Sequence, residues 1–286
     1  MIELLHHQFI QNAFIAGTII SIVCAVVGYF VVLRSQAFAA HALSHIGFAG
    51  ATGAALMGVS AMTGTFIFTL LAALGMGTLG KRIQGRDVEI GMVLSFALGL
   101  GVLFLKIYTT NANEAVGILF GSILSVTSND LLLSIITGAL TLLFIIFLFR
   151  PLLFISVDPE VAEARGVPVR LFASVFMILL AATVTEAILI VGILLVFALL
   201  VAPAAIAQHL SKRPLVTIIY SIFLGLVFTW GGLFLALLLH GPVSFFIAGL
   251  ASLSYLVIVS FAHAVSPHFY NAFYHPDREN KFTIEV

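Results

Sequence analysis

The sequence predicts an all-α protein that crosses a lipid bilayer many times, and three observations lead to this fold class. Of the 286 residues, 62% are hydrophobic and only 8% are charged, against roughly 25% charged residues in a soluble domain. The charge-free stretches 11–33, 35–80 and 214–276 each exceed the span of about 20 apolar residues that a bilayer requires. Twelve basic residues balance twelve acidic ones, which leaves no basic surface for nucleic acid, and the single Cys24 excludes a disulfide framework.

Nine apolar runs are the candidates for spanning helices. The turn at 58–64 and the triplet His240-Gly241-Pro242 divide runs that would otherwise be continuous, because Gly and Pro end helices. The shortest run, 171–185, can instead form one tilted segment with the run that follows, so eight spans is the alternative. The predicted spans are residues 12–33, 38–58, 63–80, 90–105, 131–149, 171–185, 187–208, 215–239 and 243–263.

The basic residues assign a side of the membrane to each loop. They follow the odd-numbered spans, whereas the even-numbered turns carry no Lys or Arg except Lys106 at a helix end. Cytoplasmic loops carry the excess of Lys and Arg, so we expect the basic loops and the tail 264–286 in the cytoplasm, with residues 1–263 forming the membrane domain. Segment 115–129 is apolar but too short to span, and we expect it to be re-entrant or interfacial on the outer side.

A short helix is predicted on the cytoplasmic face at about residues 158–167. Asp158 is a suitable N-cap, Pro159 fits the first helical position, and Glu160 is favoured at the positive end of a helix. Gly166 is placed to end the helix, and Pro168 prevents its continuation. From these residues alone, the alternative is an ordinary connecting loop that carries the same capping residues.

Two histidines four residues apart, His41 and His45, are the main candidates for binding a ligand. They share one face of a helix and can bind one metal ion together, since imidazole suits zinc, iron, copper and nickel. A zinc hydrolase helix would read H-E-x-x-H, but Ala42 follows His41, which argues against an intramembrane metalloprotease. The alternative is a structural pair, hydrogen-bonded inside the helix bundle.

Glu186 is the only carboxylate between Arg170 and the far tail. It lies at the junction of two predicted spans, so we expect a solvated side chain at the outer membrane face, with a pathway or gate residue as the alternative. Ser44, next to His45, is a further candidate for the pathway. A self-sufficient carrier driven by an ion gradient usually has several acids near the membrane midplane, and the sequence identifies none there, so this is the second-ranked function.

The stretch from Gly75 to Lys81 matches most of a phosphate-binding loop, G-x-x-x-x-G-K-[ST]. Arg82 follows instead of the hydroxyl residue that binds magnesium, and an apolar run precedes the stretch. We therefore expect this chain to bind no ATP.

Three stretches in the same order resemble the membrane subunit of ATP-binding-cassette importers for zinc, manganese and iron ions. The family's early motif looks like G-x-Y-x-V-L-R followed by D-A-L-S-H, and here G-Y-F-V-V-L-R at 28–34 and H-A-L-S-H at 41–45 occupy it. Its cytoplasmic segment, D-P-E-x-A-x-x-x-G-V-P, is matched at 158–168, and its late motif, V-G-x-L-L-V-x-A-L-L-x-x-P-A-x-x-A, at 191–207. The resemblance extends over about residues 14–263.

The resemblance implies a permease subunit without catalytic activity and without a permanently bound cofactor. Two copies would form the pore in a bacterial cytoplasmic membrane, two separate ATPase subunits would bind on the cytoplasmic side, and an extracytoplasmic metal-binding protein would deliver the ion. The segment comprising Asp158, Pro159, Glu160, Arg165 and Gly166 would be the coupling helix that contacts the ATPase.

The resemblance also assigns a role to the histidine pair. The Asp and the His of the family's D-A-L-S-H motif line the ion pathway, and His41 and His45 occupy those positions here. The first position therefore offers nitrogen in place of carboxylate oxygen. Nitrogen suits zinc better than manganese, so we expect zinc ahead of manganese or iron.

Overall fold

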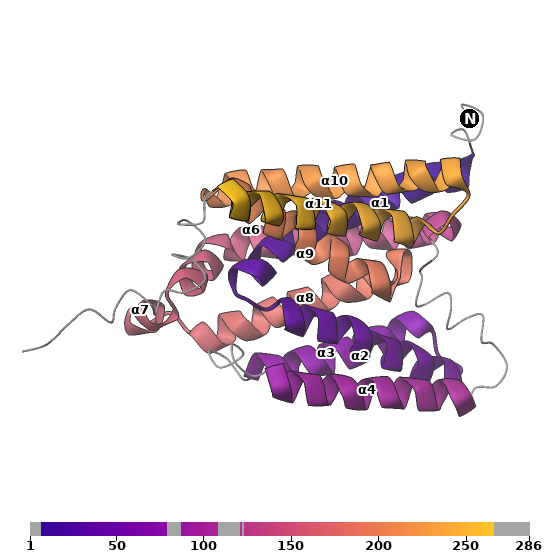
Figure 1. Cartoon of the computed structure of the whole chain (residues 1–286). Coiled ribbons are helices and arrows are strands. Elements are labelled where there is room, and N and C mark those ends of the chain that lie inside the picture. The colour runs from indigo at the N-terminus through magenta and orange to yellow at the C-terminus, as the bar shows by residue number, and fades with distance from the viewer. Residues whose placement is uncertain (1–6, 79–86, 108–120, 122, 266–286) are drawn as a thin grey trace, which may run out of the picture.

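The chain forms a bundle of long helices, and the described residues contain no strand (Figure 1). The computed structural model describes residues 7–78, 87–107, 121 and 123–265, with the side chains of 261–265 excepted. Residues 115–120 and 122 of the predicted re-entrant segment 115–129, the stretch 79–86 and the tail from residue 266 lie outside these residues. The elements are α1 (Gln8–Leu33), α2 (Ala37–Leu56), α3 (Ala61–Thr78), α4 (Asp87–Ile107), the 3-10 turn η3 (Ile123–Ser125), α6 (Ser128–Val157), α7 (Pro159–Ala164), α8 (Val169–Val191), α9 (Ile193–Leu210), α10 (Pro214–Leu239) and α11 (Val243–Val265).

Each of the nine predicted spans corresponds to one long helix in the described part of the chain. Seven of these helices are long and apolar enough to cross a bilayer by length and composition. The other two are α2, which carries the polar histidine pair, and α3, whose apolar stretch is shorter. The all-α, polytopic fold class that the sequence predicts is therefore confirmed.

The boundary between α8 and α9 differs from the prediction. We expected the break beside Glu186, but α8 continues to Val191 and ends at Gly192, which has a φ of 83°. Glycine adopts this backbone conformation without the steric cost that a Cβ imposes. A charged residue in the middle of an apolar run therefore did not end the helix, whereas the glycine did.

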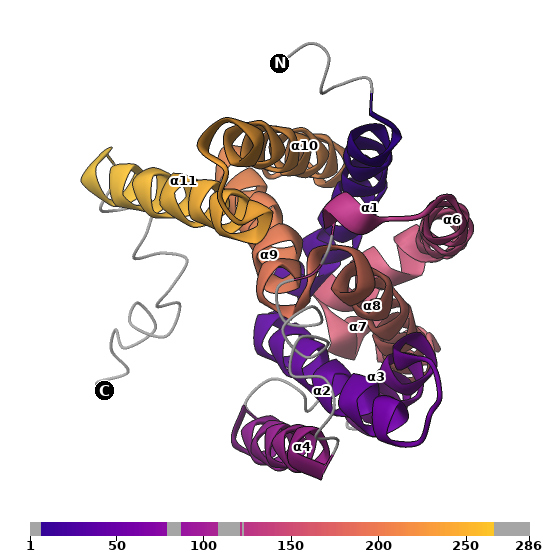
Figure 2. The ribbon, with the colours of Figure 1, turned by 90° about the vertical axis from the view of Figure 1, so that its right-hand side faces the viewer.

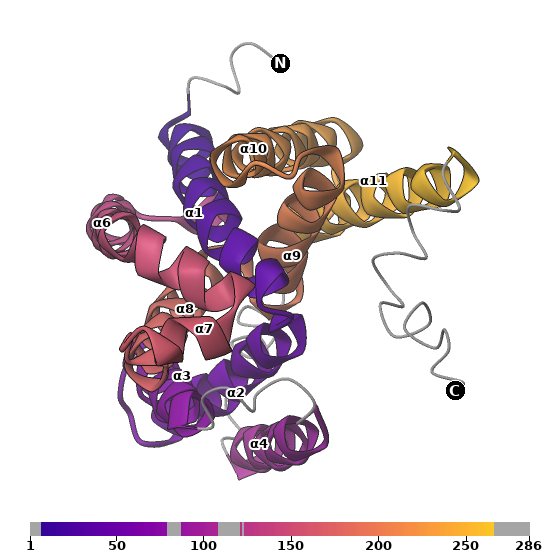
Figure 3. The same ribbon diagram turned by 90° about the vertical axis from the view of Figure 1, so that its left-hand side faces the viewer.

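Helices α1 and α8 form the interior of the bundle, and most of their residues are buried, unlike those of α4 and α11. Viewed along the helices, α1, α8 and α9 lie centrally, with α4 at one edge and α11 at the other (Figures 2 and 3). A close helix contact joins α1 to α9, where a Cβ at Gly28 would overlap the carbonyl oxygen of Leu200. Small residues permit such close approach of two helix backbones in a membrane.

The predicted short helix is present as α7 at one end of the bundle (Figure 1). The Asp158 carboxylate accepts hydrogen bonds from the backbone N–H groups of Glu160 at 3.1 Å and Val161 at 2.9 Å. Gly166 has a φ of 81° just beyond the helix, as a glycine terminator requires. Ala162 packs in a small apolar cluster with side chains of α6 and α8, which fixes α7 to the membrane helices on either side of it.

Candidate metal pathway

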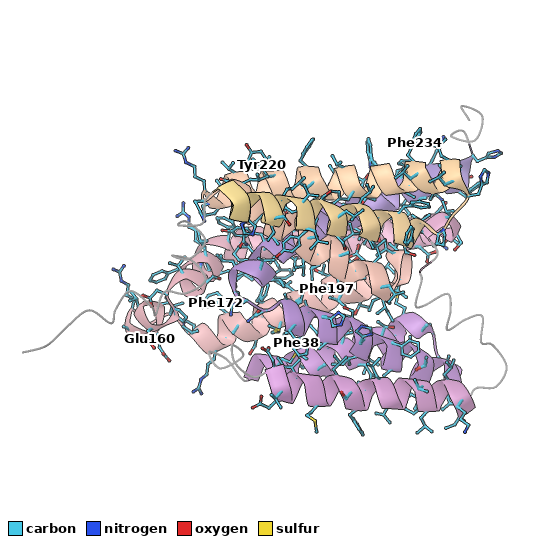
Figure 4. All side chains as sticks on the ribbon, viewed as in Figure 1. Phe38, Glu160, Phe172, Phe197, Tyr220 and Phe234 are labelled. Carbon is cyan, nitrogen blue, oxygen red and sulfur yellow. The ribbon has the colours of Figure 1, made fainter. Side chains whose placement is uncertain are left out.

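The histidine pair lies near the start of α2, on the side that faces α9. The ring centroids of His41 and His45 are 4.6 Å apart, and the rings are inclined at 79°. The His41 ring also meets the edge of Phe197 of α9, with 5.0 Å between centroids; Phe197 is labelled in Figure 4. The i, i+4 spacing thus places both imidazoles together, as the sequence predicted.

The two imidazoles are the accessible part of an otherwise buried stretch of α2. His41 and His45 are half-buried, whereas the residues between them, Ala42, Leu43 and Ser44, are buried. The Ser44 hydroxyl donates to the carbonyl oxygen of Ala40 at 3.0 Å, so its proton is used within the helix. Two partly accessible imidazole rings on the same face of a helix are suited to bind an ion that passes along that face.

The pair by itself is an incomplete metal site. Within the described residues, no group of three or more His, Cys, Asp or Glu side chains could hold a metal ion. Zinc in a stable protein site has four ligands, and one chain offers two nitrogens. Such a surface can bind an ion weakly and release it, which a transport pathway needs, and a second copy of the chain can supply further ligands.

Glu186 lies elsewhere, and the expectation of a solvated side chain at the membrane face is wrong. It is inside α8 with only 7% of its surface exposed. The carboxylate lies against Gly138 of α6, where a Cβ would be 3.5 Å from Glu186 Oε1. The hydroxyls of Ser134 and Thr137 are close by, yet neither carboxylate oxygen has a hydrogen-bond partner of regular geometry in the described part of the chain.

The sequence contained one sign of this burial that the prediction overlooked. Between residues 171 and 191 no Gly or Pro interrupts the apolar run, and Gly192 is the first residue that ends helices readily. An acid in the middle of such a run faces the interior of a bundle rather than lipid. The structure does not bring Glu186 into a cluster with the two histidines.

The amino-acid sequence was compared with those of known protein families. Residues 6–262 match the ABC 3 transport family (ABC-3). The chain belongs to this family. The resemblance expected from the three sequence motifs is thereby confirmed, and the chain is a membrane subunit of the transporter type rather than an enzyme of the metalloprotease type.

Several proteins of similar sequence have names that refer to metals. The chain is 32% identical over 269 residues to the "Manganese import system permease protein ScaB" of Streptococcus parasanguinis, covering 91% of this chain and 96% of that protein. It is 31% identical to the "Manganese transport system membrane protein MntC" of Halalkalibacterium halodurans, covering 82% and 81%. It is 34% identical to the "Probable iron transport system membrane protein" of Haemophilus influenzae, covering 74% and 78%.

A solved structure has the same arrangement of helices. The match is to "PsaBC from Streptococcus pneumoniae in complex with Fab", with a TM-score of 0.80 and 30% identity over 90% of this chain and 93% of that chain. The similarity to known proteins therefore extends from the sequence to the three-dimensional fold.

Proposed function

We propose that this chain is the permease subunit of an ABC importer for divalent transition-metal ions and spans a bacterial cytoplasmic membrane. The observation that carries the proposal is the pair of accessible imidazoles, 4.6 Å apart, on the face of α2 that meets α9. Imidazole is a ligand for divalent transition metals, and the ABC-3 relatives named above are described as manganese or iron transport proteins.

The pore is formed by two copies of the chain. One copy supplies two nitrogens, His41 and His45, and two copies related by a two-fold axis would bring four nitrogens to the pathway, the number that zinc coordinates in stable sites. A closed tetrahedral site would hold the ion too firmly for transport. The pairs therefore act one at a time or form an incomplete ligand set, and the ion is cargo rather than a resident cofactor.

We rank zinc above manganese as the transported ion because of the chemistry of the ligands, although two of the relatives are named for manganese. Nitrogen ligands bind divalent metals in an order in which manganese is weakest and iron and zinc are stronger. Carboxylate oxygen at the position of His41 would reduce this difference, because oxygen ligands suit manganese. The ratio of zinc to manganese transport is thus set largely at residue 41.

Energy for transport comes from separate ATPase subunits that bind at α7. This helix is at one end of the bundle, and Glu160, labelled in Figure 4, is on it. The Asp158 cap and the apolar anchor at Ala162 hold α7 against α6 and α8, so a push on α7 is transmitted to α8. An extracytoplasmic metal-binding protein delivers the ion to the opposite end.

Metal uptake by cells that carry variants of the histidine pair tests the proposal, with zinc and manganese in competition. His41→Ala and His45→Ala should each reduce uptake strongly, whereas His41→Asp should keep transport and move the preference towards manganese. His209→Ala removes an imidazole from an exposed position in the last turn of α9 and serves as the matched control.

The outcomes separate the pathway from its selectivity. If both alanine variants take up metal as the unmodified chain does, the pair is structural and the pathway lies elsewhere. If His41→Asp leaves the zinc-to-manganese ratio unchanged, the selectivity argument is wrong, and the pathway assignment is judged by the alanine variants alone.

A further inference from the structure

The aromatic ring of Phe197 lies directly beside the histidine pair. Its centroid is 5.0 Å from that of the His41 ring, and the two rings are inclined at 69°, an edge contact of the kind that aromatic rings favour. His41 is also in edge contact with His45, at 4.6 Å between centroids. The His41 imidazole is therefore placed between a second imidazole and an apolar ring, and an ion bound by the pair would have Phe197 as a close neighbour (Figure 4).

The face of α9 that carries Phe197 offers no metal ligand over most of its length. Its accessible residues recur every three or four positions and have apolar side chains as far as Ala205; they are Leu194, Phe197, Ala198, Val201 and Ala205. Ala198 and Val201 pack against the main apolar core, whereas the Phe197 ring contacts His41. The first accessible amide on this helix is Gln208, about three turns beyond Phe197. At the level of the pair, α9 thus presents hydrocarbon to the ion.

Hydrocarbon on one side of a bound ion leaves no partner for water molecules that the ion would otherwise keep on that side. Divalent ions differ in how readily they lose this water. Zinc is stable with four ligands, whereas Mg²⁺ demands octahedral geometry and dehydrates reluctantly, and Mn²⁺ also suits octahedral oxygen sites. An apolar wall beside the two nitrogens therefore penalises Mg²⁺ and Mn²⁺ more than zinc, in the way that hydrophobic constrictions of channels act by dewetting.

We propose that Phe197 is a specificity-determining residue of the metal pathway, which limits the hydration of an ion bound by His41 and His45 and thereby disfavours Mn²⁺ and Mg²⁺. The inference rests on the function proposed above, because it takes the pair as the metal ligands. Phe197 provides no ligand itself and acts through its position against His41. Selection by loss of water at Phe197 is thus added to selection by ligand chemistry at residue 41.

Co²⁺ bound to the purified full-length chain in lipid nanodiscs tests this role, because its visible absorption is strong with four or five ligands and weak with six. Absorption that disappears when His41→Ala and His45→Ala are combined belongs to the pair, and we expect this absorption to be strong in the unmodified chain. Phe197→Ala admits water, and Phe197→Gln adds an amide oxygen. Both variants should reduce the absorption per bound Co²⁺ severalfold, and Mn²⁺ should displace Co²⁺ from them at severalfold lower concentration.

Two control variants show whether the apolar character at this position is responsible. Phe197→Leu keeps an apolar side chain next to His41 and should retain the absorption and the resistance to Mn²⁺ of the unmodified chain. Phe234→Ala is the matched control for loss of an aromatic ring, because Phe234 is an exposed residue of α10 (Figure 4), and it should also behave as the unmodified chain does. Thermal unfolding identifies a variant that fails to fold. If Phe197→Ala does so, Phe197→Gln, whose side chain is of similar length, decides the test.

The outcomes separate this role from the proposed function. If the absorption that depends on the histidines and its displacement by Mn²⁺ are unchanged in Phe197→Ala and Phe197→Gln, the inference is wrong, while the pair remains the metal ligand. If no absorption depends on His41 and His45, the pair does not bind the metal, and the inference fails together with the proposed pathway.

Discussion

Alanine at Gly28 is expected to force α1 and α9 apart. A Cβ at this position would overlap the backbone carbonyl of Leu200, and it would also meet Ala204 Cβ at 3.5 Å. Non-bonded heavy atoms pack at about 3.5 Å, so the two helices must separate locally by roughly 1.5 Å. Since the obstacle is backbone rather than a flexible side chain, no rotamer change relieves it.

The magnitude follows from two opposing effects. Overpacking in a close-packed interior typically costs 1–3 kcal/mol, and a rigid obstacle places Gly28→Ala near the upper end, at about 3 kcal/mol. Alanine stabilises a helix interior by about 0.5–1 kcal/mol relative to glycine. The net loss in the free energy of unfolding is therefore about 2 kcal/mol. Gly99→Ala is the control, because a Cβ at Gly99 in α4 meets no described atom within 4 Å. For this variant, only the stabilisation of the helix by alanine applies, without the cost of overpacking.

Unfolding of the purified chain in mixed detergent micelles, followed by circular dichroism, measures both variants. The two should differ by about 3 kcal/mol, with Gly99→Ala slightly more stable than the unmodified chain and Gly28→Ala less stable. Metal uptake should also fall in Gly28→Ala, because α9 carries Phe197, which packs against His41. Equal stability of the two variants would show that the α1–α9 contact accommodates a methyl group and that the argument is wrong.

Two further predictions concern coupling and packing. Reversal of both charges on α7, with Glu160→Lys and Arg165→Glu, should weaken co-purification with the ATPase subunits while leaving membrane insertion unchanged; unaltered co-purification and uptake would argue against α7 as the docking element. The hydroxyls of Ser21 on α1 and Thr229 on α10 are 2.5 Å apart and buried. A double-mutant cycle with Ser21→Ala and Thr229→Val should yield a coupling of about 0.6 kcal/mol, as for other hydrogen bonds between membrane helices, and strictly additive effects would contradict it.

The sequence alone was sufficient for the features that depend on local chemistry. Apolar run length predicted the long helices, because each span must satisfy its backbone hydrogen bonds internally. The short helix α7 followed from Asp158 at its start and Gly166 at its end, both of which act on neighbouring backbone groups. The pairing of His41 with His45 followed from helix geometry, which is the same in every α-helix.

Only the tertiary structure decided which side chains those helices enclose. Hydropathy records that a run is apolar but not which neighbour each face meets, so the sequence placed Glu186 at the membrane surface. In the fold, Gly138 of α6 leaves room for the Glu186 carboxylate, and the two helices bury it beside a cavity. In the same way, Phe197 lies more than 150 residues from His41 in the chain, and only the packing of α9 on α2 brings the two rings together. Local residues determine where a helix begins and ends. Contacts between helices that are distant in sequence determine which side chains are buried and which groups they pack against.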